Sequence, residues 1–379
     1  MATAVPSRAA LAEVALLFFK LGVVGFGGPA AHVALMHEEV VRRRRWVTDE
    51  EFLDLLGATN LIPGPNSTEL AIHLGYRRAG WAGLWTAGLC FILPAFLAVL
   101  ACAWAYVRFG ALPQVASALY GAKPGILAVV AVALWGLGRT ALRDRLTAGV
   151  AVCVLAGWLW GVHELVLLFG SGLLAVAVRS GAASWTALLV TSAPAVAAAP
   201  AVPFHLDTLF FTFLKIGSVL YGSGYVLLAF LHADFVARLG WLSESQVLDA
   251  VAVGHVTPGP VFTTATFVGY LVGGWPGAVV ATVGIFLPAF VFVAATYPLV
   301  PRMRQSRLAA PFLDGVNAAS WALMAGVSLR LARASLTDGL AVVLVALALL
   351  LLWRRMNAAW VVVGCALVGV AAREVVTRL

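Results

Sequence analysis

The lysines are candidate functional residues. The chain has only three, Lys20, Lys123 and Lys215, and all three lie inside apolar segments. A charge at membrane depth costs at least about 2.5–3.5 kcal/mol, so each lysine needs a partner or a function. Lys20 and Lys215 occupy matching positions, each shortly before a glycine-rich break. We therefore expect these two to line an anion path, and an ion pair with Asp54 or Asp249 is the structural alternative.

Two kinds of helix break occur in the sequence, and each occurs twice. Gly25-Phe-Gly-Gly-Pro29 corresponds to Tyr221-Gly-Ser-Gly224, and Pro63-Gly-Pro65 corresponds to Pro258-Gly-Pro260. Glycines let backbone donors approach a ligand, and a helix that restarts after a break directs its free N–H groups and positive dipole end towards it. Isolated proline and glycine are ordinary in membrane helices, but breaks repeated at equivalent positions favour a small-anion site.

The predicted substrate-binding residues lie at a break, in the first turn after one, or just before one. They are Lys20, Gly27, Gly28, Asn60, Pro63, Gly64, Pro65, Asn66, Ser67, Thr68, Lys215, Tyr221, Gly222, Ser223, Gly224, His255, Pro258, Gly259, Pro260, Thr263 and Thr264. His255 belongs to this set because it stands opposite Asn60, three residues before the second Pro-Gly-Pro. His37 and His232 lie near segment ends, where we expect structural roles.

Enzyme, metal and nucleotide chemistry have no support in the sequence. The cysteines stand singly in apolar segments, and no HExxH or GxxxxGK[ST] motif occurs. Paired carboxylates or an activated nucleophile, which an intramembrane hydrolase would need, are not visible either. We therefore predict no catalytic residues, no metal and no cofactor.

Composition indicates the lipid bilayer as the surroundings. Of 379 residues, 62% are hydrophobic and 11% are charged, against roughly 25% charged in soluble domains. Uncharged runs long enough to cross a bilayer recur along the chain, which predicts an all-α polytopic membrane protein, placed in a bacterial-type inner membrane. The net charge of +8 comes from arginine clusters between apolar segments, a pattern typical of membrane topology and not of nucleic-acid binding.

The chain consists of two homologous halves. A single register with one deletion aligns Trp46 with Trp241, and Leu93-Pro-Ala-Phe96 with Leu287-Pro-Ala-Phe290. We assign an N-terminal repeat to 1–180, a linker or one additional short segment to 181–204, and a C-terminal repeat to 205–379. Each repeat has six segments, named a to f, with segment a over 10–37 and 205–232 and segment b over 49–77 and 244–271.

Segment b is interpreted as a re-entrant hairpin, because its first arm, from a capping box to Pro-Gly-Pro, is roughly 21 Å long and the hydrocarbon core is roughly 30 Å thick. With b re-entrant, most arginines lie on one side of the membrane, whereas making b a full crossing distributes them evenly. The prediction is therefore two inverted repeats with about ten transmembrane helices, two re-entrant Pro-Gly-Pro hairpins and both termini outside.

These motifs resemble the chromate ion transporter family in its long, two-domain form. The resemblance covers nearly the whole chain and rests on Phe26-Gly-Gly-Pro29, the stretch from Asn60 to Pro65 and the Leu-Pro-Ala-Phe segments. It implies export of chromate and chromate resistance, with sulfate as a related tetrahedral dianion. Ser223-Gly224 replaces Gly28-Pro29 in the second half, so we expect unequal contributions from the two halves.

The driving force expected is the membrane potential, with or without protons, because the acid Glu69 falls opposite a threonine and forms no paired relay. A transporter of sulfate or another small solute remains the alternative, and a homodimer is left open.

Overall fold

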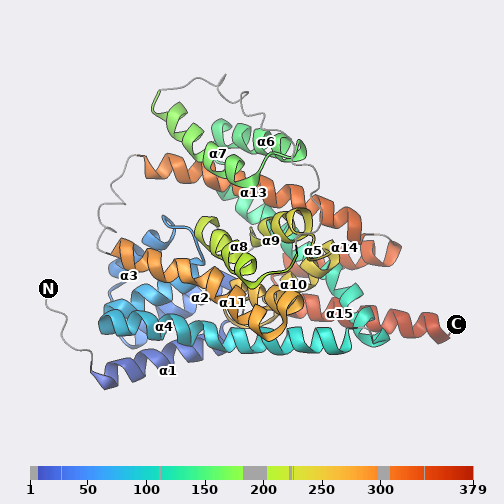
Figure 1. Cartoon of the computed structure of the whole chain (residues 1–379), viewed down its shortest axis with the longest axis horizontal. Helices are drawn as coiled ribbons and strands as arrows, with labels where there is room; N and C mark the ends of the chain where they lie inside the picture. The colour runs from blue at the N-terminus through green and yellow to red at the C-terminus, as the bar shows by residue number, and fades with distance from the viewer. Residues whose placement is uncertain are drawn as a thin grey trace.

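A computed structural model describes residues 7–26, 28–110, 112–181, 203–221, 224, 226–297, 308–336 and 338–378, with side chains up to residue 372. All regular structure in these residues is helical, in agreement with the predicted all-α class. The helices lie mostly along the long axis of the molecule, and the start of α1 and the end of α15 lie at opposite ends of that axis (Figure 1).

The two repeats contain the same series of elements. The first consists of α1 (Arg8–Val24), α2 (Gly28–His37), the π-helix η1 (Glu38–Arg43), α3 (Asp49–Thr59), α4 (Asn66–Phe109), α5 (Pro113–Ala141), α6 (Arg145–Leu159) and α7 (Glu164–Arg179). The second consists of α8 (Leu206–Val219), α9 (Leu227–Leu231), the π-helix η3 (His232–Arg238), α10 (Glu244–Val256), the short 3₁₀ helix η4 (Val261–Thr263), α11 (Thr264–Thr296), α13 (Ala309–Ser335), α14 (Gly339–Trp353) and α15 (Ala358–Arg378). Apart from the one-turn η4, which has no counterpart among the described residues of the first repeat, the correspondence extends the sequence repeat to every one of these elements.

Segment b begins as predicted and then joins segment c. The capping boxes of Thr48 with Glu51 and of Ser243 with Gln246 are both formed, and they start α3 and α10. After Pro-Gly-Pro the chain enters α4, which is interrupted at Ala79–Gly80, where Gly80 has φ +58°. A Cβ on Gly75 would clash with the carbonyl of Gly83, so the parts 66–78 and 81–109 fold back on each other. The re-entrant placement of segment b in a membrane stays a prediction.

Segment a differs from its prediction as a single crossing. Glu13, near the start of α1, binds Arg44 at 3.0 Å and Arg78 at 2.7 Å, so the chain turns at the glycine break and returns to the end from which it began. The physical reason is the break itself, because it separates α1 from α2 and lets them pack as a hairpin. The start of α1 therefore lies beside the 42–45 arginines, whereas the prediction placed a full crossing between them. The side of the membrane on which the termini lie stays a prediction.

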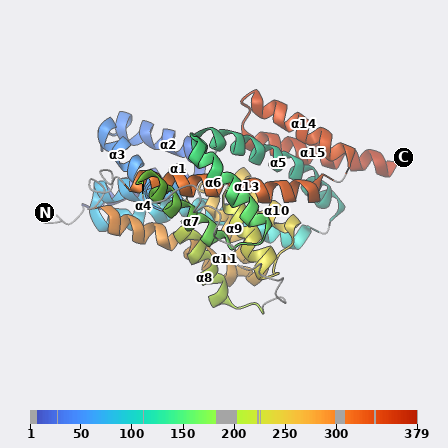
Figure 2. The ribbon, with the colours of Figure 1, turned by 90° about the horizontal axis from the view of Figure 1, so that it is seen from above.

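The repeats interlock through their last helices. α6 and α7 pack on α13 of the other repeat, while α14 and α15 pack on α5, as Figures 1 and 2 show. Arg179 joins this interface by binding Asp144 at 2.7 Å and Asp314 at 2.5 Å. The end of the molecule that contains Glu13, Arg44, Arg78 and this Arg179 cluster is called the arginine-rich end below.

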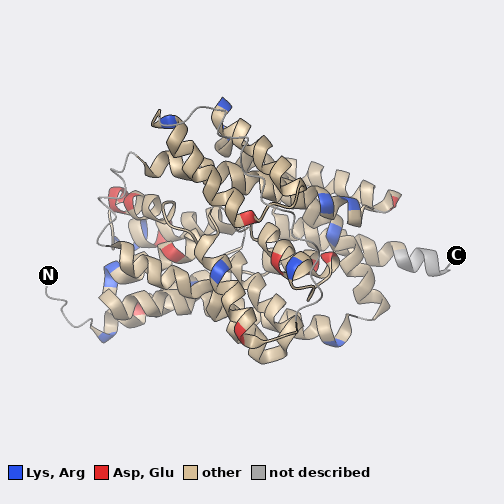
Figure 3. Ribbon diagram, turned by 45° about the horizontal axis from the view of Figure 1, so that its top comes forward, with Lys and Arg blue, Asp and Glu red and all other residues tan. Residues whose placement is uncertain are grey.

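Long uncharged stretches of helix dominate the molecule, with few charged residues among them (Figure 3). Among the described residues, three helical runs are both long and apolar enough to cross a bilayer: Asn66–Phe109, Pro113–Ala141 and Val261–Thr296. Shorter apolar helices occur at Arg145–Leu159 and Gly339–Trp353. The chain is thus an integral membrane protein, and the number of crossings stays a prediction. Most of the assigned linker, residues 182–202, lies outside the described residues.

Candidate functional site

The four sequence breaks meet near the centre of the molecule, each contacting one from the other repeat. The Gly64 amide donates to the Leu220 carbonyl at 2.8 Å, and the Gly259 amide donates to the Gly25 carbonyl at 2.9 Å. Gly64 and Gly259 have φ values of +134° and +93°, which only glycine adopts readily. The reciprocal pair of bonds means that each Pro-Gly-Pro loop is held by the broken helix of the opposite repeat.

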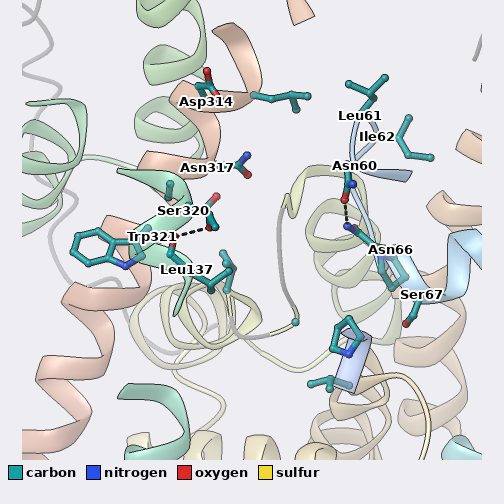
Figure 4. Close-up of a pocket in the computed structure, with 18 of the residues that line it drawn as sticks. Asn60, Leu61, Ile62, Asn66, Ser67, Leu137, Asp314, Asn317, Ser320 and Trp321 are labelled. Carbon is teal, nitrogen blue, oxygen red and sulfur yellow. Dashed lines mark hydrogen bonds between the residues drawn. The ribbon is translucent and has the colours of Figure 1, made fainter. Parts of the chain in front are cut away.

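A cavity of about 530 Å³ opens beside these loops (Figure 4). One wall comes from the loop between α3 and α4 and the first turn of α4, where Figure 4 shows Asn66 hydrogen-bonded to Asn60 at 2.8 Å. The facing wall is α13, with Asp314, Asn317, Ser320 and Trp321. Because the end of α5 and the start of α13 also line it, the cavity extends from the Pro-Gly-Pro loops towards the arginine-rich end.

The lining of the cavity suits an anion. The N-termini of α4 and of the η4–α11 run both reach it, through Asn66 and Ser67 in the first repeat and Pro260 and Val261 in the second. Helix N-termini present unpaired N–H groups and partial positive charge. Arg143 adds a full positive charge, whereas the negative charge of Asp314 is already engaged by Arg179.

The structure gathers part of the predicted set around this cavity. The lining includes Asn60, Pro65, Asn66, Ser67, Gly224 and Pro260. Pro63, Gly64, Pro258 and Gly259 form the loops behind it. Gly28 has φ +78° and starts α2, and Gly27, Gly222 and Ser223 lie outside the described residues. The binding roles of all these residues stay predictions.

Several predicted donors are turned to other partners. The hydroxyls of Thr263 and Thr264 donate to carbonyls of their own helix, at 2.8 and 2.7 Å. Thr68 is fully buried one residue beyond the cavity wall, and His255 is partly buried near the end of α10. Tyr221 is half-buried in the break after α8. These side chains therefore support the loops, and the polar side chains next to the breaks that do line the cavity, Asn60, Asn66 and Ser67, come from the first repeat.

Lys20 and Lys215 both form ion pairs with the π-helical segments. Lys20 lies 2.8 Å from Glu39, and Lys215 lies 2.5 Å from Asp234, which Arg238 also binds at 2.8 Å. Neither lysine is among the residues that line the cavity described above. The partners are not the Asp54 and Asp249 considered from the sequence, because the helix hairpin brings η1 and η3 beside the lysines.

Sequence reasoning missed the α5 and α13 residues of the site. Arg143, Asn317 and Trp321 line the cavity although they lie far along the chain from any break. The alignment of the repeats contained one indication of the Asn317 position. Asn317 is the counterpart of Lys123. A polar residue at the same position in both repeats indicates that this position does not face only lipid.

At the opposite end of the molecule the corresponding space is filled. α10 packs against α5 and α15, and Lys123 donates to Ser245 at 2.6 Å and lies 3.9 Å from Asp249. Asp249 also accepts from the Tyr106 hydroxyl at 2.9 Å. Within the described residues, α3 makes no comparable packing on α13 and α7, and the cavity lies there instead. The space between α3 and α13 is thus open, whereas the equivalent space between α10 and α5 is filled. A second cavity of about 520 Å³ lies elsewhere, between the α6–α7 loop, η3 and the end of α13.

Two interlocked, equivalent repeats around a central site are an architecture typical of membrane transporters. The model of the chromate transporter family matches residues 12–176 and again residues 208–370, so the chain belongs to that family and carries its domain twice.

Named relatives match along most of their length. A "Chromate transport protein" of Cupriavidus metallidurans is 34% identical over 96% of this chain and 93% of its own. A "Probable chromate transport protein" of Synechococcus elongatus is 34% identical over 86% of each chain, and a "Chromate transport protein" of Pseudomonas aeruginosa is 33% identical over 97% of this chain and 93% of its own. The search of solved structures gave no significant match.

Proposed function

We propose that the protein exports chromate across the inner membrane and thereby confers chromate resistance, with the central cavity as the anion site. The observation that carries the proposal is the convergence of two helix N-termini, one from each repeat, with Asn66, Ser67 and Arg143 on one cavity. Chromate is a small tetrahedral dianion, and its oxygens accept hydrogen bonds in every direction. Backbone N–H groups, an amide, a hydroxyl and a guanidinium are the donors that such an ion needs.

Alternation between two arrangements supplies the transport step. The first repeat is open, with the cavity between α3 and α13, and the second is closed, with α10 packed on α5. Because the repeats are equivalent, exchanging their arrangements closes α3 onto α13 and separates α10 from α5, which exposes the same loops to the opposite side. Lys123 and Asp249 are then the groups that hold the outer side closed in the arrangement described here.

The membrane potential provides the driving force. Moving one charge through 100 mV is worth about 2.3 kcal/mol, so a bare dianion that leaves a cell negative inside gains about 4.6 kcal/mol. That free energy supports a gradient of roughly a thousandfold. Export therefore requires no coupled ion, although it tolerates one that travels with the anion.

Proteoliposomes loaded with chromate test the proposal. A potassium-diffusion potential is imposed at equal pH on both sides, and efflux is expected to rise with the potential. Efflux that ignores the potential and follows only a pH gradient contradicts it. The same vesicles loaded with sulfate, or with chromate against excess external sulfate, decide between chromate and sulfate as the preferred dianion.

A further inference from the structure

Glu69 is a buried acid that the transport mechanism above does not use. It lies in the first turns of α4, directly beyond the cavity-lining Asn66 and Ser67, and its exposure is 0%. Among the described residues neither carboxylate oxygen has a hydrogen-bond partner. Gly64 lies against this carboxylate, since a Cβ there would clash with a Glu69 oxygen. A charge is not stable in such a place without a partner, so the group is suited to hold a proton.

His73 continues the same face of α4. It lies one turn beyond Glu69, is also fully buried, and neither ring nitrogen has a partner among the described residues. Residues three and four apart share one helix face, which adds Tyr76 to the series. The Tyr297 ring lies 5.9 Å from that of His73 and 4.3 Å from that of Tyr76. The series therefore runs from the cavity wall towards the arginine-rich end, where Arg77 binds Glu51 at 3.1 Å.

The second repeat lacks this series. Threonine stands at the position of Glu69, Phe267 at that of His73, and only Tyr270 matches Tyr76. The threonine hydroxyls are bonded to their own helix. If Glu69 and His73 served only to pack the helices, both repeats would be expected to have them. Their presence in one repeat alone favours a function that is performed once per molecule.

In the described part of the chain, no charged side chain forms an ion pair with Glu69. The acidic, basic and histidine residues on the helices packed against α4 are Arg8, Glu13 and Lys20 on α1, His32 and His37 on α2, Asp49, Glu50, Glu51 and Asp54 on α3, and Glu244, Asp249 and His255 on α10. α11 has none. Of these, the groups engaged with partners elsewhere include Glu13, Lys20, His32, His37, Asp49, Glu51, Glu244 and Asp249.

A metal ion is a poorer occupant than a proton. Within the described part of the chain, no group of three or more histidine, cysteine or acidic side chains could hold a metal. Sodium and divalent cations require several oxygen ligands at once, whereas a proton requires one basic oxygen.

Building on the proposed function, we propose that Glu69 binds a proton that crosses the membrane together with the anion, and that His73 and Tyr76 connect it to the arginine-rich end. Co-binding follows from charge, because an ionised carboxylate one turn behind the cavity wall repels a dianion and a neutral acid does not. It also follows from access, since both the cavity and the Glu69 series lead to the same end. The transported unit then carries one net negative charge instead of two.

The charge moved per chromate is the decisive measurement. In proteoliposomes at alkaline and equal pH, where chromate is fully dianionic, its distribution at equilibrium is measured against the imposed potential. We expect a tenfold chromate gradient at an imposed potential of about 59 mV in the wild type, the value for one charge moved per chromate. For Glu69→Gln we expect the same gradient at about 30 mV, the value for two charges. A pH-sensitive dye should report proton movement with chromate in the wild type and none in Glu69→Gln.

The controls keep the two proposals separable. The slope of the chromate gradient against the potential at equilibrium does not depend on how much of the protein is active. Glu69→Thr, which copies the residue of the second repeat, is used in place of Glu69→Gln should that variant fail to fold. Asp207→Asn, which removes an exposed carboxylate at the start of α8, should keep the wild-type slope. A wild type that moves chromate with a two-charge slope, or a slope that responds to replacement of sodium by choline, overturns the proton site alone. A wild type that moves no chromate overturns the proposed function.

Discussion

Side chains at the first turn of α4 have the clearest chemistry in the molecule. Asn66 is held by Asn60, and Ser67 follows it at the cavity wall, so an amide and a hydroxyl are positioned at a helix N-terminus. A positioned donor is worth more to an anion than a mobile one, because less conformational freedom is lost on binding. Lys20 and Lys215, by contrast, are positively charged but are not available to an anion, because each forms an ion pair with a carboxylate.

Asn66→Ala is predicted to weaken chromate binding without unfolding the protein. A hydrogen bond to a charged group is worth about 1.5–3 kcal/mol, so the apparent KM should rise roughly 10- to 100-fold. Uptake of labelled chromate into inverted membrane vesicles measures it. The matched control is Asn357→Ala, which removes an asparagine that accepts from the Ala359 amide just ahead of α15, away from the cavity. Equal KM values for the two variants would exclude Asn66 from the site.

Helix packing fills the space beside α10 and leaves the equivalent space beside α3 open. α10 and α3 are equivalent in sequence and have equivalent caps, yet only α10 is packed extensively against the long helix of the opposite repeat in the described structure. Lys123 contributes to the difference, because it bridges α5 to Ser245 and Asp249, whereas its counterpart Asn317 faces the cavity. A long cation on one side and a short amide on the other make the two closures unequal in free energy.

Lys123→Asn, which makes the two repeats alike at this position, is predicted to open the outer side more often. Ala252→Cys, one turn beyond Asp249 on α10, reports the opening in a background that lacks the native cysteines; Ala252 is only 6% exposed in the closed arrangement. Its reaction with an impermeant thiol reagent added outside should become about tenfold faster, which corresponds to about 1.4 kcal/mol. Lys123→Arg retains the charge and should react at the original rate. Unchanged labelling in Lys123→Asn would refute the outer closure.

The arginines are distributed unevenly between the two ends of the molecule. Arg42–Arg45, Arg78, Arg143 and Arg179 lie at the arginine-rich end, and ion pairs connect the start of α1 to the same end. Cytoplasmic loops carry the excess of arginine in membrane proteins, so we predict that this end faces the cytoplasm and that the end of α15 lies outside. In that orientation the cavity opens towards the cytoplasm, as the proposed export requires for loading.

Cysteine accessibility tests this orientation directly. In intact cells, Ser7→Cys and Arg42→Cys should resist an impermeant reagent added outside and react after permeabilisation, whereas Arg333→Cys, near the end of α13, should react in intact cells. Labelling of Ser7→Cys from outside would restore segment a as a crossing and would contradict the hairpin formed by α1 and α2.

Much of the architecture is determined by local sequence. Apolar runs without charge require helices in a bilayer, a capping box starts a helix wherever it occurs, and Pro-Gly-Pro ends one, so the repeat, the starts of α3 and α10 and the breaks could all be predicted. The positions of Asn60, Asn66 and Pro260 at the site followed from the same breaks, because a break is a property of a few adjacent residues.

The tertiary structure alone decided which of these local features meet. A glycine break shows that a helix stops but not the direction in which the next helix leaves, and only the contacts of Glu13 with Arg44 and Arg78 show that segment a returns. The joining of each Pro-Gly-Pro loop to the opposite repeat, the packing of α7 on α13 and the pairing of Lys20 with Glu39 likewise depend on residues distant in sequence. Local chemistry determines where helices begin and end, whereas the burial of Glu69 and the opening of one end are properties of how the two repeats pack together.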